Sequence, residues 1–251
     1  IRIPAKLWSA SSPYCEAAVK VIKCIKEEAC ARAAGAIAEL VRGKSGCTLA
    51  LSAAPDLMGV YDALASSGVD FSQSQVFLTE EYLGQDVPEG CSRASILRER
   101  LFAPEKCRCG KFAAPETSGD LNENCAGYDA LIAAAGGIDL AVLAIGVNGH
   151  IAFNEPLAAY DSGTHMTKLT DVTRREEWAC EGSSAPPEGI TVGKKTLVHA
   201  RRVILVAFGE EKADAVHSAV DGRAHISVPA SLMQLHDNVA VYLDSGAASL
   251  I

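Results

Sequence analysis

Short apolar runs alternate along the chain with longer stretches in which apolar residues recur at helical spacing. The apolar runs fall at residues 48–51, 75–79, 140–145, 203–207 and 239–243. Most of them are apolar at successive positions, which is typical of strands that are buried on both faces of a parallel sheet. The alternation of such strands with helices predicts an α/β fold of three αβα layers around a Rossmann-like, mostly parallel sheet.

The helical patterns lie between these runs. The longest extends from about residue 13 to residue 41, with Ser12 as N-cap, Pro13 at the first helical position and an end near Gly43. Further helices are expected at about residues 55–67, 91–103, 123–135 and 210–220.

Two stretches do not fit this alternation. Residues 104–120 contain Pro, Gly, Cys and Ser and are interpreted as a surface loop. Residues 156–190 form a long polar connection with a helical pattern near residues 174–178. Long connections in compact α/β domains often act as lids, although a plain surface excursion has the same composition. We therefore predict a single domain over residues 1–251 with a lid-like insertion at about 156–190.

The composition supports a well-formed core. Of 251 residues, 49% are hydrophobic and 22% are charged, which excludes general disorder. No apolar run approaches the roughly 20 residues that a membrane-spanning helix needs. The first residues show no signal-peptide pattern, but they also lack an initiator Met, so an omitted leader stays open. These features predict a soluble, cytoplasmic protein.

The charge balance bears on the partners of the protein. The chain has 23 basic and 31 acidic residues, a formal charge of −8, and its densest basic clusters are isolated arginine pairs. Nucleic acids and membranes are therefore not expected as partners. An anionic small molecule stays compatible, because a pocket needs only local positive charge.

The nine cysteines do not form a metal-binding pattern. The sequence contains no C-x-x-C, and the close pair Cys107 and Cys109 has no second pair or histidine at zinc spacing. We therefore expect no metal and no other cofactor. The odd number of cysteines favours reduced thiols in an intracellular protein.

Candidate catalytic residues follow the strand at 140–145, because ligands of open α/β sheets bind beyond the carboxyl ends of the strands. Glycines flank Asn148 and His150 in the sequence Gly146-Val147-Asn148-Gly149-His150. His150 titrates nearest neutrality and can transfer a proton. Asn148 and Glu155 are close enough in sequence to orient its two ring nitrogens. A purely structural histidine is the alternative.

Further candidate residues follow the strand at 75–79, where Glu80 and Glu81 are adjacent, and we expect Glu80 to converge on one cleft with Asn148, His150 and Glu155. Adjacent carboxylates usually belong to a solvated turn. If one of them is desolvated in a cleft, its pKa rises and it can act as a base.

The sequence of residues 143–156, Leu-Ala-Ile-Gly-Val-Asn-Gly-His-Ile-Ala-Phe-Asn-Glu-Pro, resembles the signature of glucosamine-6-phosphate deaminases, also called isomerases. The sister 6-phosphogluconolactonases share the Gly-His turn but generally not the Phe-Asn-Glu-Pro that follows. Residues 77–84, 189–202 and 229–236 resemble further segments of the deaminase family. Nearly the whole chain can be laid on the family pattern.

The resemblance implies an enzyme that converts an amino-sugar phosphate to a keto-sugar phosphate and ammonia. His150, held by Asn148 and Glu155, would help to open the sugar ring, and Glu80 would move the proton between C2 and C1. Lys212 corresponds to the phosphate-binding lysine of the family, and residues 156–190 correspond to its mobile lid. The positions of Ala54 and Glu81 are the other expected substrate contacts. Assembly into a homo-oligomer stays open.

Three departures from the family pattern raise alternatives. Glu80 replaces an aspartate, and Ala54-Pro55-Asp56 replaces the Gly-Gly-Thr that precedes Pro in the phosphate loop of the family. Pro55 has no N–H to donate, and Asp56 places a carboxylate beside the expected anion. The phosphate-binding arginine of the family falls near Ala179. Two alternatives to a working deaminase therefore stay open. One is a non-catalytic or regulatory relative of the family, and the other is an enzyme with the same chemistry on a different sugar.

Overall fold

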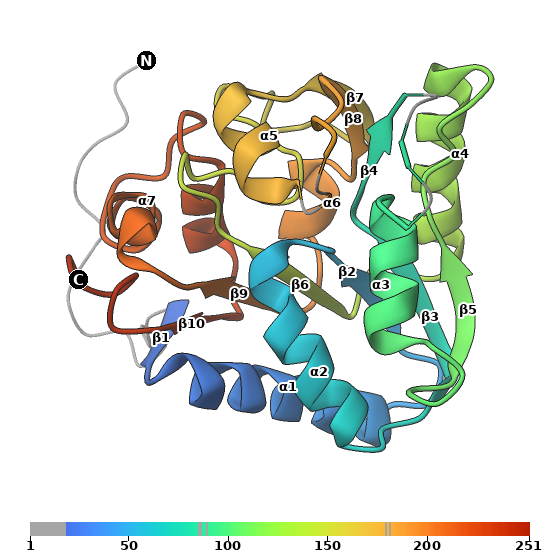
Figure 1. Ribbon diagram of the computed structural model, residues 1–251, viewed down its shortest axis with the longest axis horizontal. Helices are drawn as coiled ribbons and strands as arrows, with labels where there is room; N and C mark the ends of the chain where they lie inside the picture. The colour runs from blue at the N-terminus through green and yellow to red at the C-terminus, as the bar shows by residue number, and fades with distance from the viewer. Residues whose placement is uncertain (1–18, 85–86, 89, 179, 181) are drawn as a thin grey trace, which may run out of the picture.

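The computed structural model describes residues 19–84, 87–88, 90–178, 180 and 182–251 (Figure 1). Its central sheet has seven strands in the order β1-β10-β9-β6-β2-β3-β5, and every neighbouring pair is parallel. The strands are β1 (Val19–Lys23), β2 (Thr48–Leu51), β3 (Phe71–Leu78), β5 (Cys109–Ala113), β6 (Leu140–Ala144), β9 (Val203–Ala207) and β10 (Val239–Leu243). The predicted strands at 48–51, 75–79, 140–145 and 203–207 are adjacent in this sheet and none is at an edge, which confirms the predicted fold class.

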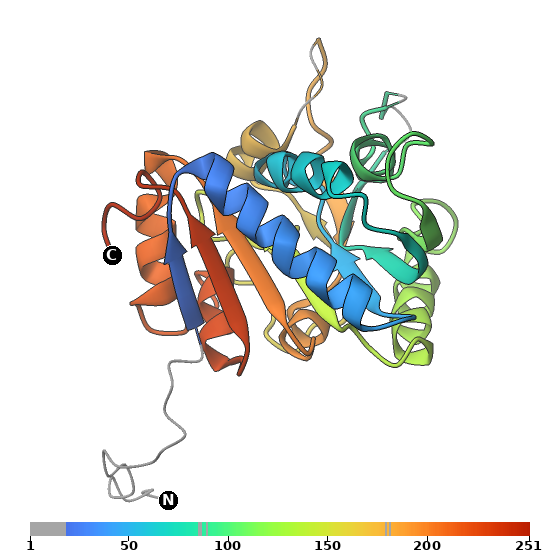
Figure 2. The same cartoon turned by 90° about the horizontal axis from the view of Figure 1, so that it is seen from below.

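Helices cover both faces of the sheet and complete three layers (Figures 1 and 2). One apolar cluster joins one face to α1 (Lys26–Gly43), α2 (Met58–Ser66) and α3 (Arg93–Leu101). A second cluster joins the other face to α4 (Leu121–Ala134), α6 (Lys194–Val198) and α7 (Ala213–Val220). Figure 2 shows α1 running across the strands on its face. The strands β2, β6, β9 and β10 are buried at all positions, since both faces are covered.

The predicted beginning of the first helix, at about residue 13, is wrong. Residues 19–23 form the edge strand β1, which pairs with β10, and the helix begins at Lys26. The β-branched residues Val19, Val21 and Ile22 favour this extended conformation. The helix ends at Gly43, as predicted, whereas Ser12 and Pro13 lie outside the described residues.

The surface loop expected at 104–120 contains a strand instead. Strand β5 forms the other edge of the sheet beside β3, and its burial is only partial. An edge strand with a glycine and a lysine in its five residues has the composition of a loop, and this explains the error.

Residues 156–190 contain two strands and a helix, namely β7 (His165–Lys168), α5 (Asp171–Glu177) and most of β8 (Glu188–Thr191). β8 pairs antiparallel with β7 and with β4 (Glu80–Leu83), which makes a small second sheet. Helix α5 begins after Thr170, whose hydroxyl accepts a hydrogen bond from the Thr173 N–H at 3.3 Å. The helical pattern near 174–178 is thus confirmed, and Figure 1 shows this segment above the central sheet.

The structure joins Cys91 and Cys180 in a disulfide, 89 positions apart in sequence. The expectation that all cysteines are reduced is wrong for this pair, because sequence spacing alone does not reveal that the fold brings residues before α3 and after α5 together. Among the described residues, six further cysteines are free thiols, at positions 24, 30, 47, 107, 109 and 125. Within the described residues no helix has the length and apolar character to cross a bilayer.

Candidate active site

The loop after β6 presents His150 because two glycines allow its path. Gly149 has φ +80°, a conformation that side chains disfavour. A Cβ atom on Gly146 would lie 2.0 Å from the His150 ring, so the absence of a side chain there lets the imidazole pack against the backbone. The result is a fully buried histidine at the carboxyl end of a central strand.

One ring nitrogen of His150 is held by a chain of two side chains. Its Nδ1 lies 2.8 Å from Asn148 Oδ1, and the amide of Asn148 donates to Glu155 Oε2 at 3.0 Å. The backbone N–H of Thr170 donates to the other Glu155 oxygen at 2.8 Å. The structure brings Asn148, His150 and Glu155 together, as expected, whereas the convergence of Glu80 on the same cleft stays a prediction. The expectation that Asn148 and Glu155 orient both ring nitrogens is wrong, since they act on Nδ1 alone and Glu155 reaches it only through Asn148.

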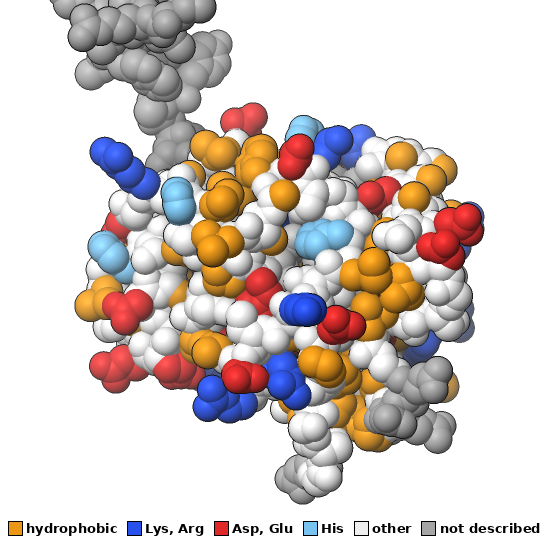
Figure 3. All heavy atoms as spheres, turned by 90° about the horizontal axis from the view of Figure 1, so that it is seen from above, with side chains coloured by type: hydrophobic (Ala, Val, Ile, Leu, Met, Phe, Trp, Pro, Cys, Tyr) orange, Lys and Arg blue, Asp and Glu red, His pale blue; other side chains and the backbone are white. Residues whose placement is uncertain are grey.

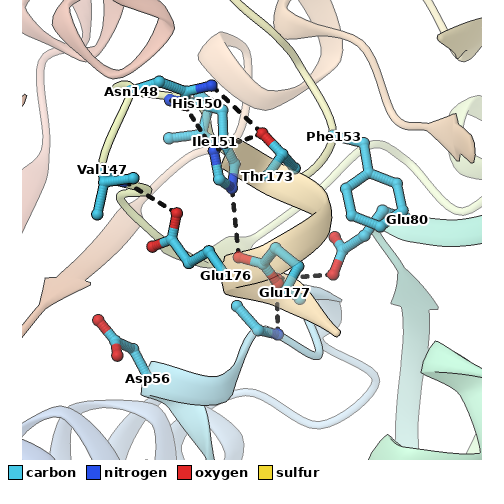
Figure 4. A network of polar contacts seen from close by, with 12 residues as sticks. Asp56, Glu80, Val147, Asn148, His150, Ile151, Phe153, Thr173, Glu176 and Glu177 are labelled. Atoms are coloured by element: carbon cyan, nitrogen blue, oxygen red, sulfur yellow. Dashed lines mark hydrogen bonds and ion pairs between the residues drawn. The ribbon is translucent and has the colours of Figure 1, made fainter. Parts of the chain in front are cut away.

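The other ring nitrogen faces Glu177, which the sequence reasoning did not identify. His150 Nε2 lies 3.2 Å from Glu177 Oε1 (Figure 4). Glu177 Oε2 accepts a hydrogen bond from Arg93 at 2.6 Å. Burial by itself raises the pKa of Glu177, but the Arg93 charge and the His150 hydrogen bond outweigh it and lower this pKa to about 2. Burial by itself lowers the pKa of His150, and Glu177 outweighs it, so that this pKa is raised.

Arg93 is the buried partner that fixes Glu177. Its guanidinium also donates to the Ala53 carbonyl at 2.8 Å and to the Tyr82 hydroxyl at 2.9 Å, and it lies over the Tyr82 ring. Neither Arg93 nor Glu177 stands in a motif, and α3 and α5 are far apart in sequence. Cys91 lies just before α3, and Cys180 lies just after α5. A disulfide inferred between these two cysteines would have indicated that the segments meet.

Glu80 begins β4 and is 1% exposed. One of its carboxylate oxygens accepts hydrogen bonds from the Ser52 hydroxyl at 2.8 Å and from the Ala53 N–H at 2.9 Å, and the Thr79 hydroxyl donates to the other. Burial raises the pKa of Glu80 to about 7, although Arg93 acts in the opposite direction. From the sequence, Glu80 and Glu81 are interpreted either as a solvated turn or as the site of a desolvated base. The burial and the raised pKa of Glu80 fit the desolvated base.

Glu81 has a different environment. Its carboxylate accepts hydrogen bonds from the backbone N–H groups of Tyr82, Arg93 and Ala94 at 2.8–2.9 Å. Two of these groups belong to the first turn of α3, whose unpaired donors need such acceptors. The substrate contact expected of Glu81 stays a prediction, and this geometry supports a structural role.

Lys212 lies in the connection before α7 and is buried between two carboxylates. Its Nζ is 2.8 Å from Asp56 Oδ2 and 2.8 Å from Glu176 Oε1. Burial by itself lowers the pKa of Lys212, and the two carboxylates outweigh it and raise this pKa. The N–H of Ala54 donates to Ser52 Oγ at 3.2 Å. The lysine expected to bind phosphate is thus already paired with side chains of the chain itself.

A cavity of about 610 Å³ opens above this lysine. Its lining residues are Ala54, Pro55, Asp56, Val147, Val172, Arg175, Glu176, Glu177, Glu211 and Lys212. Among the residues that the structure describes, neither His150 nor Glu80 lines the cavity. Glu177 lines it and contacts His150, so Glu177 separates the histidine from the cavity (Figure 4). Seen from above, the middle of this face carries acidic and basic side chains close together (Figure 3).

The chain is similar to known proteins over most of its length. Residues 23–242 match the family of glucosamine-6-phosphate isomerases/6-phosphogluconolactonase. A glucosamine-6-phosphate deaminase of Rhodococcus opacus is 38% identical over 85% of this chain and 86% of its own length. A glucosamine-6-phosphate deaminase of Rhodopirellula baltica is 37% identical over 90% of this chain and 92% of its own.

Solved structures agree with the sequence relatives. A monomeric glucosamine-6-phosphate deaminase superposes with a TM-score of 0.86 at 29% identity, over 92% of this chain and all of the other. A 6-phosphogluconolactonase of Trypanosoma brucei has a TM-score of 0.74 at 17% identity, over 92% of this chain and 97% of its own, and shares the fold. The chain belongs to the family of glucosamine-6-phosphate isomerases and 6-phosphogluconolactonases.

Proposed function

We propose that this protein is a glucosamine-6-phosphate deaminase, which converts an amino-sugar phosphate to a keto-sugar phosphate and ammonia. The observation that carries the proposal is Glu80, a buried carboxyl whose pKa of about 7 suits a general base near neutral pH. The similarity to named deaminases over most of the chain supports the same reaction.

The roles of the residues follow from their contacts. His150, whose Nδ1 is fixed by Asn148 and Glu155, uses Nε2 to move the proton that opens the pyranose ring. Glu80 then takes the proton from C2 of the open aldose and returns it to C1. Hydration of the resulting imine at C2 releases ammonia and leaves the ketose. These steps need only side chains and water, so we propose no cofactor.

The binding of the phosphate is proposed to centre on Lys212, with the backbone at Ala54 beside it and residues 156–190 acting as the lid. Asp56 favours a second candidate, the same chemistry on an amino sugar without a phosphate, because its carboxylate holds the lysine at 2.8 Å. A non-catalytic relative is the third reading. We further propose that the chain acts as a single domain and leave assembly into a homo-oligomer open.

The proposed location is the cytoplasm. Because disulfides are rare in that reducing compartment, this location requires that Cys91 and Cys180, which the structure joins, be reduced there or only transiently oxidised. Within the described part of the chain, the mixed charges around the cavity give no support to a nucleic-acid partner.

Ammonia release from glucosamine 6-phosphate and from glucosamine tests the proposal. We expect turnover of the phosphate ester, and a His150→Ala variant with kcat lower by about 10²–10⁴-fold. The thermal unfolding of the variant serves as the control for folding. Turnover of glucosamine alone would favour the second candidate. Absence of ammonia from both sugars, with intact folding, would indicate the non-catalytic relative.

A further inference from the structure

Helix α5 places a carboxylate where the substrate's phosphate is expected. We propose that Glu176 is an internal competitor of the substrate's phosphate for Lys212, and that substrate binds by displacing it. This inference rests on the proposed function, because it takes the site of Lys212 as the phosphate site. It assigns to Glu176 control over substrate affinity, a role that the signature residues do not provide.

The two carboxylates on Lys212 are not equivalent. The Asp56 carboxylate accepts two hydrogen bonds, one from Lys212 Nζ at 2.8 Å and one from the Phe208 N–H at 3.1 Å. Glu176 Oε1 lies 2.8 Å from Nζ, yet it has no hydrogen-bond partner of suitable geometry in the described residues. Its other oxygen accepts from the Val147 N–H at 3.0 Å. Glu176 is therefore the more weakly held partner of the lysine.

The positions of Asp56 and Glu176 in the fold also indicate that Glu176 is the more weakly held partner of Lys212. Asp56 belongs to a short 3-10 turn, Pro55–Leu57, that leads directly into α2 and packs on the central sheet. Glu176 belongs to α5, a helix of seven residues in the polar insertion outside the central sheet. A movement of α5 that removes Glu176 from Lys212 leaves the central sheet in place but strains the buried Glu177–Arg93 ion pair, whereas Asp56 belongs to a connection that packs on the sheet.

The groups that Glu176 engages are those that a phosphate would need. With Glu176 in place, its carboxylate occupies a lysine ammonium and a backbone N–H, both of which are donors that favour phosphate oxygens. The acidic residues that line the cavity outnumber the basic ones, with Asp56, Glu176, Glu177 and Glu211 against Arg175 and Lys212. Like-charge repulsion is smaller, and phosphate binding more favourable, when at least one carboxylate leaves the lysine.

Displacement of Glu176 also affects the catalytic end of the site. Glu177 follows it on the same helix and covers His150 Nε2. A shift of α5 that frees both Lys212 and this ring nitrogen also breaks the buried Glu177–Arg93 ion pair, so only a ligand that compensates for this loss can produce it. The arrangement keeps both ends of the site closed until a ligand competes successfully for Lys212.

Titration calorimetry with inorganic phosphate, and separately with glucosamine 6-phosphate, tests the inference on the intact protein. Replacement of the competitor by the isosteric amide, Glu176→Gln, should tighten phosphate binding about 5- to 30-fold, the factor that corresponds to one or two kcal/mol. The matched control is Glu211→Gln, which removes the same charge from the lining of the same cavity. Among the described residues, the ion pairs of Lys212 are with Asp56 and Glu176 and not with Glu211. We expect the control to change phosphate affinity by less than about threefold at 0.15 M salt, where the Debye length is about 8 Å.

Two further variants make the result specific. Glu176→Asp keeps the charge on a shorter side chain and should give a smaller gain than Glu176→Gln. In a Lys212→Met background the gain from Glu176→Gln should disappear, because the competition is for that ammonium. Unchanged affinity in Glu176→Gln, or an equal gain in Glu211→Gln, would overturn the inference. Inorganic phosphate needs no turnover, so a gain in binding without ammonia release would refute the proposed function and leave this inference standing.

Discussion

His150 Nε2 and Glu177 Oε1 lie 3.2 Å apart, although 27 positions separate the two residues in sequence. The contact places a carboxylate, itself ion-paired with Arg93, against the nitrogen that the loop after β6 presents. It makes the protonation of the histidine depend on a helix outside the central sheet.

The Arg93–Glu177 pair is expected to dominate the local stability. Glu177→Gln should lower the free energy of unfolding by about 3–5 kcal/mol, because it leaves a buried guanidinium without its counter-ion. Urea unfolding at neutral pH measures this loss. The double change Arg93→Met with Glu177→Leu should cost less than the single change, and a larger cost would contradict the ion-pair explanation.

The same carboxylate predicts an acid dependence of stability. Its pKa is lowered from 4.5 to about 2 in the folded protein, so its stabilising contribution is complete above pH 4.5 and is lost as the pH falls toward 2. Urea unfolding over this pH range should show the decline in the wild type. Glu177→Gln should lack this component, and an identical decline in both proteins would assign it to other groups.

Glu80 predicts opposite trends for activity and stability. Its pKa is raised from 4.5 to about 7, so kcat/KM should rise with pH through about 7 as the base ionises. The folded state holds this proton more tightly than the unfolded state, so the contribution of Glu80 to stability should fall between pH 4.5 and 7 and then level off. Rate profiles and unfolding measured for the wild type and Glu80→Gln check both trends. A kcat/KM that is flat between pH 5 and 8 would remove Glu80 from the role of base.

Shortening the base should affect turnover and spare binding. Glu80→Asp moves the carboxylate away from the Ser52 hydroxyl and the Ala53 N–H, which fix it in the wild type. We expect kcat to fall by about 10²-fold, the loss that a misplacement of about 1 Å can cause, with substrate affinity nearly unchanged. Steady-state kinetics and calorimetry separate the two quantities. A variant as active as the wild type would show that the site accommodates either length.

The altered phosphate loop should weaken sugar-phosphate binding. The double change Pro55→Gly with Asp56→Thr supplies an N–H donor and a hydroxyl, and it removes the carboxylate that pairs with Lys212. We expect glucosamine 6-phosphate to bind about 5- to 150-fold more tightly, which corresponds to roughly 1–3 kcal/mol. Titration at fixed ionic strength measures the gain, and glucosamine serves as the control ligand because it lacks the phosphate. Micromolar binding by the wild type without any gain in the variant would contradict this view of the loop.

The disulfide should stabilise the protein by tying the end of α5 to the start of α3. Cys91→Ser with Cys180→Ser is expected to lower the free energy of unfolding by about 2–5 kcal/mol, as for other native disulfides. Cys24→Ser, which removes a free thiol, is the control. Equal stability of the double variant and the control would mean that the tether contributes nothing to the folded state.

The core of the fold was predictable because continuous burial leaves a strong pattern. The runs that form β2, β6, β9 and β10 are apolar at nearly every position, and all of their residues are buried. The edge strands β1 and β5 are only partly buried, so their sequences resemble a helix and a loop. Half-exposed positions carry little information about the partner strand.

The residues of the candidate site also divide into those that a local sequence reveals and those that only the packed fold brings together. Asn148, His150 and Glu155 stand within eight residues of one another, so a local sequence reveals them. Arg93, Glu176 and Glu177 act through contacts that exist only once α3 and α5 have packed, and each looks in sequence like an exposed charge on a helix. Asp56 was recognised as a change in the phosphate loop, but its ion pair with Lys212, 156 positions away, was not predictable.

Because Glu176 and Glu177 are neighbours on one short helix, the ion pair on Lys212 and the contact on His150 are thermodynamically linked. A ligand that shifts α5 withdraws a carboxylate from the imidazole, and this withdrawal makes the histidine a weaker base. Linkage is reciprocal, so the affinity of such a ligand must itself depend on the proton occupancy of His150. The charge at the far end of the sugar and the acid–base chemistry at its ring would then form one coupled equilibrium, with α5 as the element that they share.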